Sequence, residues 1–396
     1  MLVELVVENF YSFRDETAFS MVAATIPEHP ETVTGNGGLQ LSKVSSIFGA
    51  NASGKSNLLK AFKLIQEGLL LPKGDEAEWL KKIQPFHLDE SFENKDSLLE
   101  VSFYNEKVLY RYGFYANQKE VIEEYLYIEN GEPELCFHRT KDGVEGDWET
   151  GDIQPDRLLF ADMLPNIPRI ERWFKNAYVI LNTQQLLFKI SMAKLHLKKY
   201  KHNLMTLIQL ADPSIHDVEI REVADPKTGE KHDEFYVIKL KKQLDGSLNP
   251  IREGFLFEDE QSTGTVKLLS MAGPIIEAMS NGGLLLIDEM DRSLHTLMTR
   301  YVMELFRGDF NRFGAQLIFS THDISNLRSD LFRRDQVWFV EKKTAGNSVL
   351  TSLVEYRFDE KDRKNSFEFY RNYLNGKYGA VPFLPPADWW VDNDET

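Results

Sequence analysis

Apolar and polar residues alternate along the N-terminal stretch MLVELVVENFYSF, and this pattern predicts two short strands with a turn between them over residues 2–22. A β-rich run at 43–49, KVSSIFG, predicts a further strand that ends in glycine. From residue 55 the apolar positions recur with a helical period, and Gly68 and Pro72 predict where this helix ends. The chain therefore opens with strands, followed by a strand–helix unit.

The middle of the chain changes character twice. Short β runs separated by turn-like residues between about 98 and 130 predict an antiparallel sheet, and the Gly- and Asp-rich residues 131–157 predict a loop. Residues 167–211 are mostly helix-permissive and predict a helical insertion. Residues 216–258 return to strand-like alternation, with a turn at 225–230.

Strands and helices alternate in the C-terminal part, after a helix predicted over about 263–280. The predicted strands cover 284–288, 315–320 and 336–342, and the predicted helices between them cover 292–307 and 323–333. This alternation is typical of a parallel, doubly wound sheet. We expect three parts: an N-terminal lobe (1–165) with the phosphate loop described below and the antiparallel β subdomain, a helical insertion (166–215) and a C-terminal lobe (216–396).

Composition limits which cellular compartment and which binding partners we expect. The chain has 62 acidic and 46 basic residues and a formal net charge of −16 at pH 7, which disfavours non-specific coating of DNA but leaves room for a local basic groove. The single cysteine, Cys136, cannot form an internal disulfide, so we expect a buried, unreactive thiol in a cytoplasmic protein. Apolar runs such as GLLLI at 283–287 are far shorter than the roughly 18–20 residues of a membrane-spanning helix, so we expect no membrane partner.

Residues 49–56, GANASGKS, fit G-x-x-x-x-G-K-[ST] between a predicted strand and a predicted helix, which is the context that a phosphate-binding loop requires. The two glycines let backbone N–H groups face the phosphates, and the helix dipole adds to the attraction. Lys55 would reach the β- and γ-phosphates, where it acts as a catalytic group, and Ser56 would ligate Mg²⁺. The nucleotide-binding residues predicted here are Gly49, Asn51, Ala52, Ser53, Gly54, Lys55, Ser56 and Asn57.

We expect the nucleotide to be ATP. A GTP-binding protein usually carries an Asn-Lys-x-Asp guanine reader, and NKDS at 94–97 lacks the final Asp at the right place.

The stretch LLLIDEM at 284–290 predicts a buried strand with two carboxylates at its carboxyl end. In phosphate-loop NTPases that position belongs to the Mg²⁺ shell, so Asp288 is the predicted metal ligand. Glu289 can orient and polarise the attacking water as a general base. Two carboxylates at a strand end also occur as a helix N-cap pair, and the phosphate loop in the same chain favours the catalytic interpretation.

Two more stretches complete the predicted site. In LIFSTHD at 317–323, His322 would stand beside the γ-phosphate and sense it, although a lone His at a strand end is often structural. Ser262, Gly264 and Thr265 stand at the start of a predicted helix, where backbone N–H groups, a hydroxyl and the helix dipole make an anion site. An ordinary N-cap is the alternative for that helix start.

The order of these motifs resembles the ABC-type ATPase heads of the SMC and recombination-repair group. It is more closely similar to the stand-alone bacterial ATPases of the RloA-like class and to the ATPase domain of the OLD family. The resemblance spans the chain and rests on NFYSFRDE, GANASGKSN, STGT, LLLIDEMDRSLH, QLIFSTHD, RRDQVWFVEK and YLNGKYGAVPF. It implies an α/β fold, the ABC-type ATPase head (P-loop NTPase), with an antiparallel β subdomain and a short helical insertion.

The resemblance also implies roles for particular residues. Ser262 and Gly264 would belong to the signature that closes on ATP bound by a second copy, so the working unit is a head-to-tail dimer at least and is compatible with a larger ring. Asp291, with Ser293 and His295, falls in the loop that crosses the dimer interface. Gln84, within IQPFHLDE, matches the region of the Mg²⁺-sensing glutamine and is otherwise an ordinary turn residue.

For function, the resemblance implies an ATP-binding and hydrolysing switch in bacterial anti-phage defence. It would control a separate effector, a nuclease from a neighbouring gene, and respond to a phage-encoded trigger. OLD nucleases continue into a Toprim nuclease domain, and residues 323–396 carry no matching acidic motifs, so we expect no nuclease activity in this chain.

Other functions stay open. A DNA-repair or chromosome-handling ATPase would bind nucleic acid directly, for which the basic stretch KLHLKKYKH at 194–202 is a candidate surface or else a solvated helix face. A transporter ATPase subunit is a third class. Trp389 and Trp390 would anchor a partner or pack on their own lobe.

Overall fold

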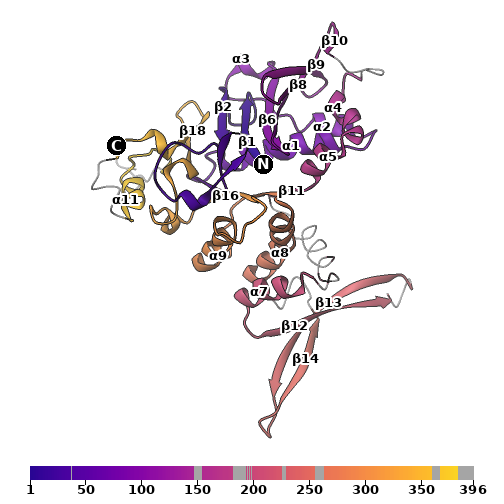
Figure 1. The fold of residues 1–396 in the computed structure, drawn as a ribbon, viewed down its shortest axis with the longest axis vertical. Helices are drawn as coiled ribbons and strands as arrows, with labels where there is room; N and C mark the ends of the chain where they lie inside the picture. The colour runs from indigo at the N-terminus through magenta and orange to yellow at the C-terminus, as the bar shows by residue number, and fades with distance from the viewer. Residues whose placement is uncertain are drawn as a thin grey trace, which may run out of the picture.

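A six-stranded sheet lies at the centre of the molecule, and the strand before the phosphate loop, β5, is inside it (Figure 1). The structure is a computed structural model that describes residues 1–36, 38–146, 154–181, 193, 195, 197, 199–224, 229–254, 263–358 and 366–381. Every neighbouring pair in this sheet is parallel except β17 with β18. In spatial order the strands are β11 (Ala177–Ile180), β15 (Leu284–Ile287), β16 (Gln316–Thr321), β5 (Val44–Phe48), β17 (Val337–Lys342) and β18 (Ser348–Ser352).

Both faces of β15 and β16 are buried, which explains why their apolar residues form continuous runs rather than an alternating pattern. Leu284 and Leu286 of β15 join a core with the phosphate-loop helix α1 (Lys55–Leu70) and the antiparallel sheet. Leu285 and Ile287 of the same strand join a second core, on the opposite face, with the helices α8 (Thr263–Asn281) and α9 (Thr296–Arg307). The central sheet is therefore packed between two cores, one on each of its faces.

A seven-stranded antiparallel sheet forms the upper part of the molecule in Figure 1. Its order is β10 (Gly143–Gly146), β9 (Pro133–Thr140), β8 (Val121–Glu129), β7 (Val108–Ala116), β6 (Ser97–Asn105), β1 (Leu2–Glu8) and β2 (Thr17–Ser20). The predicted strands over 2–22 and 98–130 are confirmed. The loop predicted over 131–157 is wrong for β9 and β10, because the pairing of β9 with β8 and of β10 with β9, together with burial of Cys136 and Phe137, outweighs the nearby turn residues. Residues 147–153 of that loop lie outside the described residues.

The segment predicted as a helical insertion is only partly helical in the described residues. It contains α5 (Pro168–Lys175) and α7 (Lys201–Ala211), but β11 lies between them and pairs with β15 at the sheet edge. The sequence AYVI of β11 is short, and its pairing with a distant strand decides its conformation.

A three-stranded antiparallel sheet projects from the body below α7 (Figure 1), and we call it the arm. Its strands are β12 (Ile215–Ala224), β13 (Lys231–Lys242) and β14 (Leu248–Gly254), which confirms the predicted strand-like segment as far as Gly254. Residues 225–228 of the predicted turn and residues 255–258 lie outside the described residues. At the base of the arm, Val218 and Val237 are buried against the second core. At its far end Leu244 and Leu248 are exposed.

The C-terminal alternation is confirmed for α8, β15, α9, β16 and β17, but the helix predicted over 323–333 is wrong. Only a three-residue 3₁₀ turn, η3 (Ile324–Asn326), forms there. Asp323 caps this turn and also accepts a hydrogen bond from Thr296 at 2.8 Å, so side chains hold the backbone in place of a helix. Among the described residues, no helix is long and apolar enough to cross a membrane.

Smaller elements complete the described chain. They are β3 (Val33–Asn36), β4 (Leu39–Ser42), α2 (Glu76–Leu80), α3 (Glu90–Glu93), α4 (Leu159–Met163), α11 (Glu368–Leu374) and the 3₁₀ turns η1 (Pro30–Thr32), η2 (Leu164–Asn166), η4 (Arg334–Gln336) and η5 (Leu353–Glu355).

Candidate nucleotide site

Three predicted motifs meet at one edge of the central sheet. Gly49, Asp288 and His322 each follow the last residue of β5, β15 and β16. These strands are parallel and adjacent, with Ile287 opposite Phe319 and Thr321 opposite Phe48, so their carboxyl ends lie together. Ligands of open α/β sheets bind at this edge, and the phosphate loop, the acidic pair and the histidine therefore face one site.

The phosphate loop needs both of its glycines. Gly54 has a φ of 112°, and a Cβ there would overlap with the hydroxyls of Ser348 and Ser12. A Cβ at Gly49 would overlap with the carbonyl oxygen of Val340 in β17. Between them Ala52 is also left-handed, with a φ of 59°. This backbone turns successive N–H groups to one side, which is how a loop binds an anion.

Lys55 is held inside the loop that it would serve. Its ammonium donates to the carbonyl oxygens of Gly49 at 2.8 Å and Ala50 at 2.9 Å. Burial lowers the pKa of Lys55 to about 8, while the negative charges of Asp288, Glu289 and Asp291 oppose the fall. The acidic residues that follow β15 thus act electrostatically on Lys55, which stands at the end of the neighbouring phosphate loop.

The side chains around the loop fit a magnesium nucleotide. Ser53 is buried, and its Oγ has no hydrogen-bond partner among the described residues, so it is an unsatisfied polar atom inside the phosphate loop. Ser56 is half-buried in the first turn of α1, and a hydroxyl with the Asp288 carboxylate is the oxygen donor set that Mg²⁺ prefers. Asn57 donates to Ser12 Oγ at 2.9 Å, which ties α1 to the N-terminal segment.

Asp288 and Glu289 lie together but point to different partners. The hydroxyl of Ser320 donates a hydrogen bond to Asp288 at 2.5 Å, and the same hydroxyl oxygen accepts one from the backbone N–H of Glu289 at 2.7 Å. Glu289 is left-handed, with a φ of 47°, and its Oε2 lies 3.1 Å from Arg292. Backbone strain of this kind gathers at functional sites.

The histidine and the loop after the acidic pair are linked. The backbone N–H of His322 donates to the carboxylate of Asp291, at 3.2 Å and 3.3 Å to its two oxygens. Burial lowers the pKa of His322, the positive Lys55 adds to the fall, and the charges of Asp291, Glu289 and Asp288 oppose it. In the same loop Ser293 is left-handed and exposed, and His295 caps α9 by accepting from the N–H of Leu297.

The predicted signature is only partly within the described residues. Ser262 lies outside them, whereas Gly264 and Thr265 form the first turn of α8. Two residues on, the ammonium of Lys267 donates to the carbonyl oxygen of Glu289. This contact places the first turns of α8 beside the acidic pair of the same chain.

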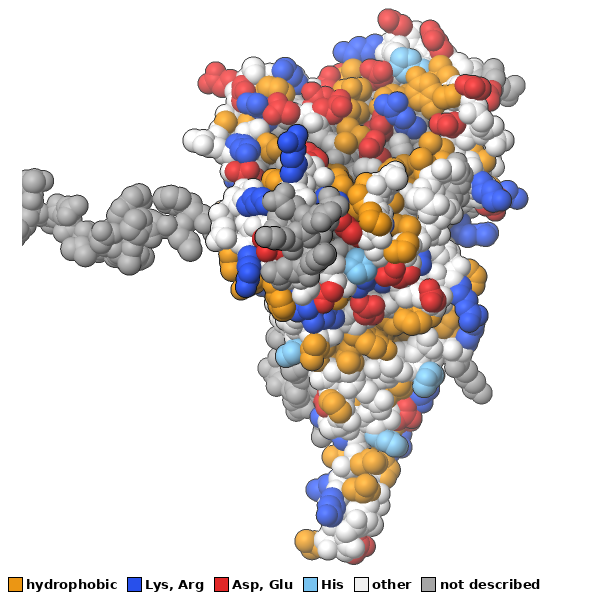
Figure 2. Space-filling view, turned by 60° about the vertical axis from the view of Figure 1, so that its left-hand side comes forward, with side chains coloured by type: hydrophobic (Ala, Val, Ile, Leu, Met, Phe, Trp, Pro, Cys, Tyr) orange, Lys and Arg blue, Asp and Glu red, His pale blue; other side chains and the backbone are white. Residues whose placement is uncertain are grey.

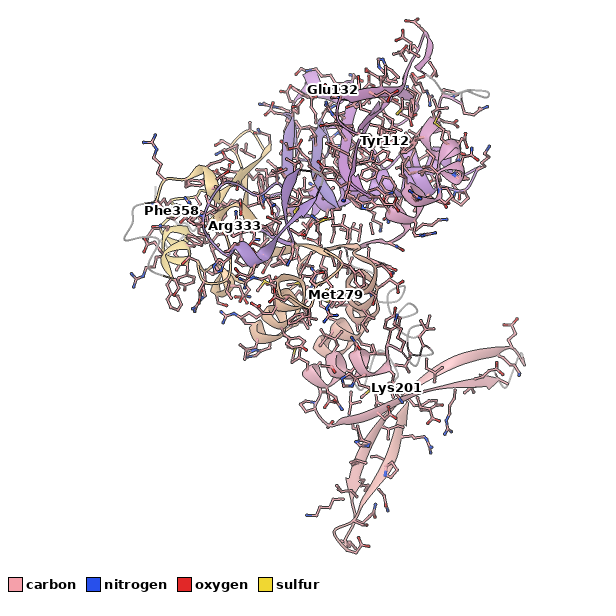
Figure 3. The ribbon with its side chains drawn as sticks, viewed as in Figure 1. Tyr112, Glu132, Lys201, Met279, Arg333 and Phe358 are labelled. Atoms are coloured by element: carbon pink, nitrogen blue, oxygen red, sulfur yellow. The ribbon has the colours of Figure 1, made fainter. Side chains whose placement is uncertain are left out.

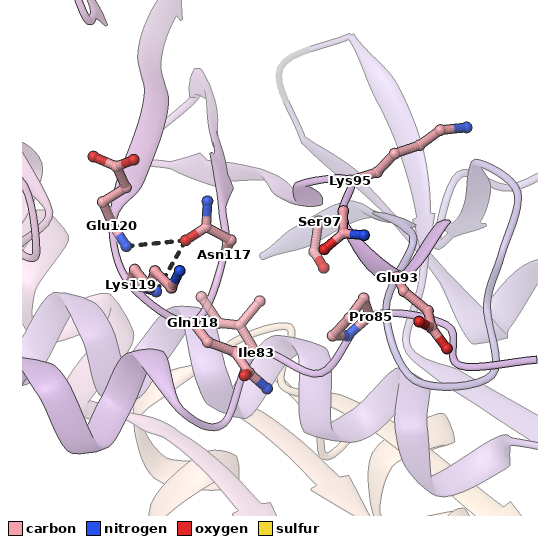
Figure 4. A pocket seen from close by; sticks show the side chains of 10 residues that line it. Ile83, Pro85, Glu93, Lys95, Ser97, Asn117, Gln118, Lys119 and Glu120 are labelled. Carbon is pink, nitrogen blue, oxygen red and sulfur yellow. Dashed lines mark hydrogen bonds between the residues drawn. The ribbon is translucent and has the colours of Figure 1, made fainter. Parts of the chain in front are cut away.

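Gln84 is not brought to the acidic pair by any contact in the described part of the chain. Its side-chain amide donates to the carbonyl of Lys81 at 2.6 Å, and its backbone carbonyl accepts from Tyr11 at 2.7 Å. Its role as Mg²⁺ sensor stays a prediction. The neighbouring residues Ile83 and Pro85 line a separate pocket of about 320 Å³ between the β6 and β8 ends (Figure 4), which contains none of the predicted site residues.

A larger open cavity of about 1330 Å³ borders the site itself. The residues that line it come from the phosphate loop, His322, β17 and the C-terminal segment, including Gly49, Ser53, Val340, Tyr373 and Val381.

The candidate basic stretch is divided between described and undescribed residues. Lys194 and Lys198 lie outside the described residues, as do Trp389 and Trp390. Lys201 lies at the base of the arm (Figure 3) and pairs with Asp217 of β12 at 2.8 Å. On the face in Figure 2 acidic and basic side chains are interspersed.

Sequence reasoning missed four side chains that support the site. Ser320 holds the acidic pair, Lys267 contacts Glu289, and the hydroxyls of Ser12 and Ser348 pack against Gly54. Lys267 had a signal, because it is the one charged residue in the mostly apolar stretch 266–276. Serines such as Ser348 come from distant strands and carry no local signal.

A largely parallel sheet with a phosphate loop and an acidic strand end at one edge defines the α/β fold of a P-loop NTPase. Residues 44–329 match the family described as "AAA domain, putative AbiEii toxin, Type IV TA system", and the chain belongs to this family. Comparison with curated proteins gives no match.

Solved structures similar to this chain include SMC heads. One is titled "SMC head domain from Thermotoga maritima", with a TM-score of 0.43 and 15% identity over 89% of this chain and 98% of that one. Another, an SmcHead bound to the C-winged helix domain of ScpA, has a TM-score of 0.45 and 16% identity over 92% of this chain and 99% of that one.

Proposed function

We propose that this protein binds ATP with Mg²⁺ at the sheet edge and hydrolyses it as a switch. The observation that carries the proposal is the convergence of Lys55, Asp288, Glu289 and His322 at the ends of three adjacent parallel strands. The loop N–H groups and Lys55 bind the β- and γ-phosphates, which draws Lys55 away from the carbonyls that it contacts now.

Ser56 and Asp288 would hold Mg²⁺, which neutralises charge on the phosphates. Glu289 accepts a proton from the attacking water, and His322 contacts the γ-phosphate. For Glu289 to reach that water, its carboxylate must leave Arg292, and this is inexpensive because both side chains are partly exposed.

The proposed working unit is a head-to-tail dimer at least. Gly264 and Thr265 form the first turn of α8, and the start of a helix attracts anions through its backbone N–H groups and its dipole. The open cavity of about 1330 Å³ beside the phosphate loop leaves this edge of the sheet accessible to a second copy. Asp291 stands at the same edge, in the loop that would face the second copy.

The proposed biological role is control of a separate effector in anti-phage defence. The family description, a putative AbiEii toxin of a type IV toxin–antitoxin system, supports a two-component role, as does the motif resemblance to the RloA-like class. The motif order also resembles AriA, the ATPase of the PARIS defence system. The effector would be a nuclease encoded nearby, and a phage product would be the trigger.

Phosphate release and light scattering with and without ATP test this function. Wild-type protein should hydrolyse ATP; Glu289→Gln should abolish hydrolysis, keep ATP binding and accumulate an ATP-dependent dimer, while Lys55→Ala should lose ATP binding. Glu78→Gln, at a carboxylate whose side chain is 75% exposed, is the matched control and should behave as wild type.

Wild-type hydrolysis rates in Glu289→Gln would overturn the assignment of the base. Co-purification of Glu289→Gln from its host tests the biological role. A stoichiometric protein that depends on ATP supports the effector, whereas bound DNA or RNA without a protein partner favours the repair class.

A further inference from the structure

Lys267 makes a contact that the proposed chemistry does not use. It stands in the second turn of α8 among apolar residues, and its ammonium donates to the backbone carbonyl of Glu289. Burial lowers the pKa of Lys267 to about 8, and the charges of Asp291 and Glu289 oppose that fall. A lysine that keeps its charge in so apolar a setting needs a compensating partner. The carbonyl of Glu289 and the acidic loop that follows β15 provide it.

The Glu289 peptide is held from two elements. Its N–H donates to Ser320 of β16, and its carbonyl accepts from Lys267 of α8. Its left-handed backbone is unfavourable for a non-glycine residue and persists only because neighbours impose it. Since the side chain leaves the backbone between these two anchors, a shift of α8 against β16 turns the Glu289 carboxylate.

The same helix carries the turn to which the proposed function assigns phosphate binding. Gly264 and Lys267 are three residues apart, about 4.5 Å along the helix axis, so they move as one rigid unit. We propose that Lys267 is a positioning residue that couples the place of the first turn of α8 to the orientation of Glu289. In this way, engagement of α8 with a phosphate sets the catalytic geometry of the chain's own base. The inference rests on the proposed function.

The test compares Lys267→Met with Lys43→Met in the full chain. Lys43 also donates to a backbone carbonyl, that of Glu31 at 2.9 Å, but it lies at the amino end of β5, away from the site. A misplacement near 1 Å costs about a hundredfold in rate, so kcat should fall about ten- to a hundredfold in Lys267→Met. The Kd for ATP should stay within about twofold, and Lys267→Arg should recover most of kcat.

A merely structural role predicts a lower melting temperature with kcat per folded molecule unchanged, and that result overturns the inference. Should Lys267→Met not fold, Lys267→Gln, whose side chain is uncharged and one atom shorter than that of lysine, replaces it with the same expected and overturning results. Wild-type protein that does not hydrolyse ATP would overturn the proposed function as a whole. Wild-type hydrolysis combined with unchanged kcat in the variant overturns the coupling alone.

Discussion

The hydroxyl of Ser320 lies 2.5 Å from the carboxylate of Asp288, to which it donates, and it also accepts from the N–H of Glu289 at 2.7 Å. One buried side chain of β16 therefore holds both acidic residues at the end of β15. The parallel pairing of the two strands brings Ser320 to this place, since Ile287 is opposite Phe319. The proposed metal ligand and the proposed base share this support.

Ser320→Ala should lower ATP hydrolysis about ten- to a hundredfold, because partners that orient a metal ligand typically have effects of this size. Its apparent affinity for Mg²⁺ should weaken in parallel, which a magnesium titration of phosphate release measures. Ser45→Ala is the matched control, because Ser45 is fully buried in neighbouring β5 and its Oγ has no hydrogen-bond partner among the described residues. Equal losses in the two variants would show that burial, and not the contact with Asp288, causes the effect.

Gly54→Ala should abolish nucleotide binding, measured with a fluorescent ATP analogue. Two costs combine there: a left-handed backbone and overlap with the hydroxyls of Ser348 and Ser12. Gly74→Ala separates them, because Gly74 has a similar φ of 107° but open space around its Cβ position. It should cost only about 1–2 kcal/mol in denaturant unfolding and leave ATP binding intact.

Residues at the ends of the sheet strands could be predicted because local sequence specifies them. The phosphate loop combines a strand, glycines and a helix start within 43–58, and the acidic pair directly follows four apolar residues. These signals can be read from the sequence because strands that are buried on both faces of a sheet are continuous apolar runs. The periodicity of apolar residues and the turn-forming residues were therefore enough to place Lys55, Asp288 and His322 at one edge of the central sheet.

Features that depend on distant pairing could not be predicted in this way. The strand β9 contains buried Phe137 but sits among turn residues, and β11 has four residues whose partner, β15, comes more than a hundred residues later. The wrong helix after His322 has the same cause, because Asp323 bonds to Thr296 of another element. In the segment after His322, tertiary contacts outweigh the helix propensity of the sequence.

A buried cluster around Glu124 supports the N-terminal lobe, near Tyr112 in Figure 3. Four donors converge on the fully buried carboxylate: the hydroxyl of Tyr112 at 2.9 Å, the backbone N–H groups of Leu159 and Phe160 at 2.7 Å and 2.9 Å, and the Arg139 guanidinium at 3.4 Å. The cluster joins β7, β8 and β9 to the first turn of α4, which lies beside α1.

Glu124→Gln should destabilise the protein by about 3 kcal/mol in denaturant unfolding, because the new amide group must face N–H donors and cannot satisfy them. The adjacent Glu123→Gln is the control. Glu123 is partly exposed and pairs with His138 at 2.8 Å, and such a pair contributes about 0–1 kcal/mol. Similar losses at both positions would contradict the role of the buried cluster.

The stability of the wild type should also depend on pH through Glu124. Burial raises the pKa of this carboxyl above 4.5, against the opposing effect of the hydrogen bonds and Arg139. Between 4.5 and the raised value the folded state binds more protons than the unfolded state, so this contribution to stability falls as pH rises through that window. Glu124→Gln lacks this titration, so the difference in unfolding free energy between wild type and variant should be larger near pH 4.5 than at pH 7. A difference that grows from pH 4.5 to pH 7 would mean that the folded protein holds Glu124 as a preferred anion, and the sign of the shift would then be wrong.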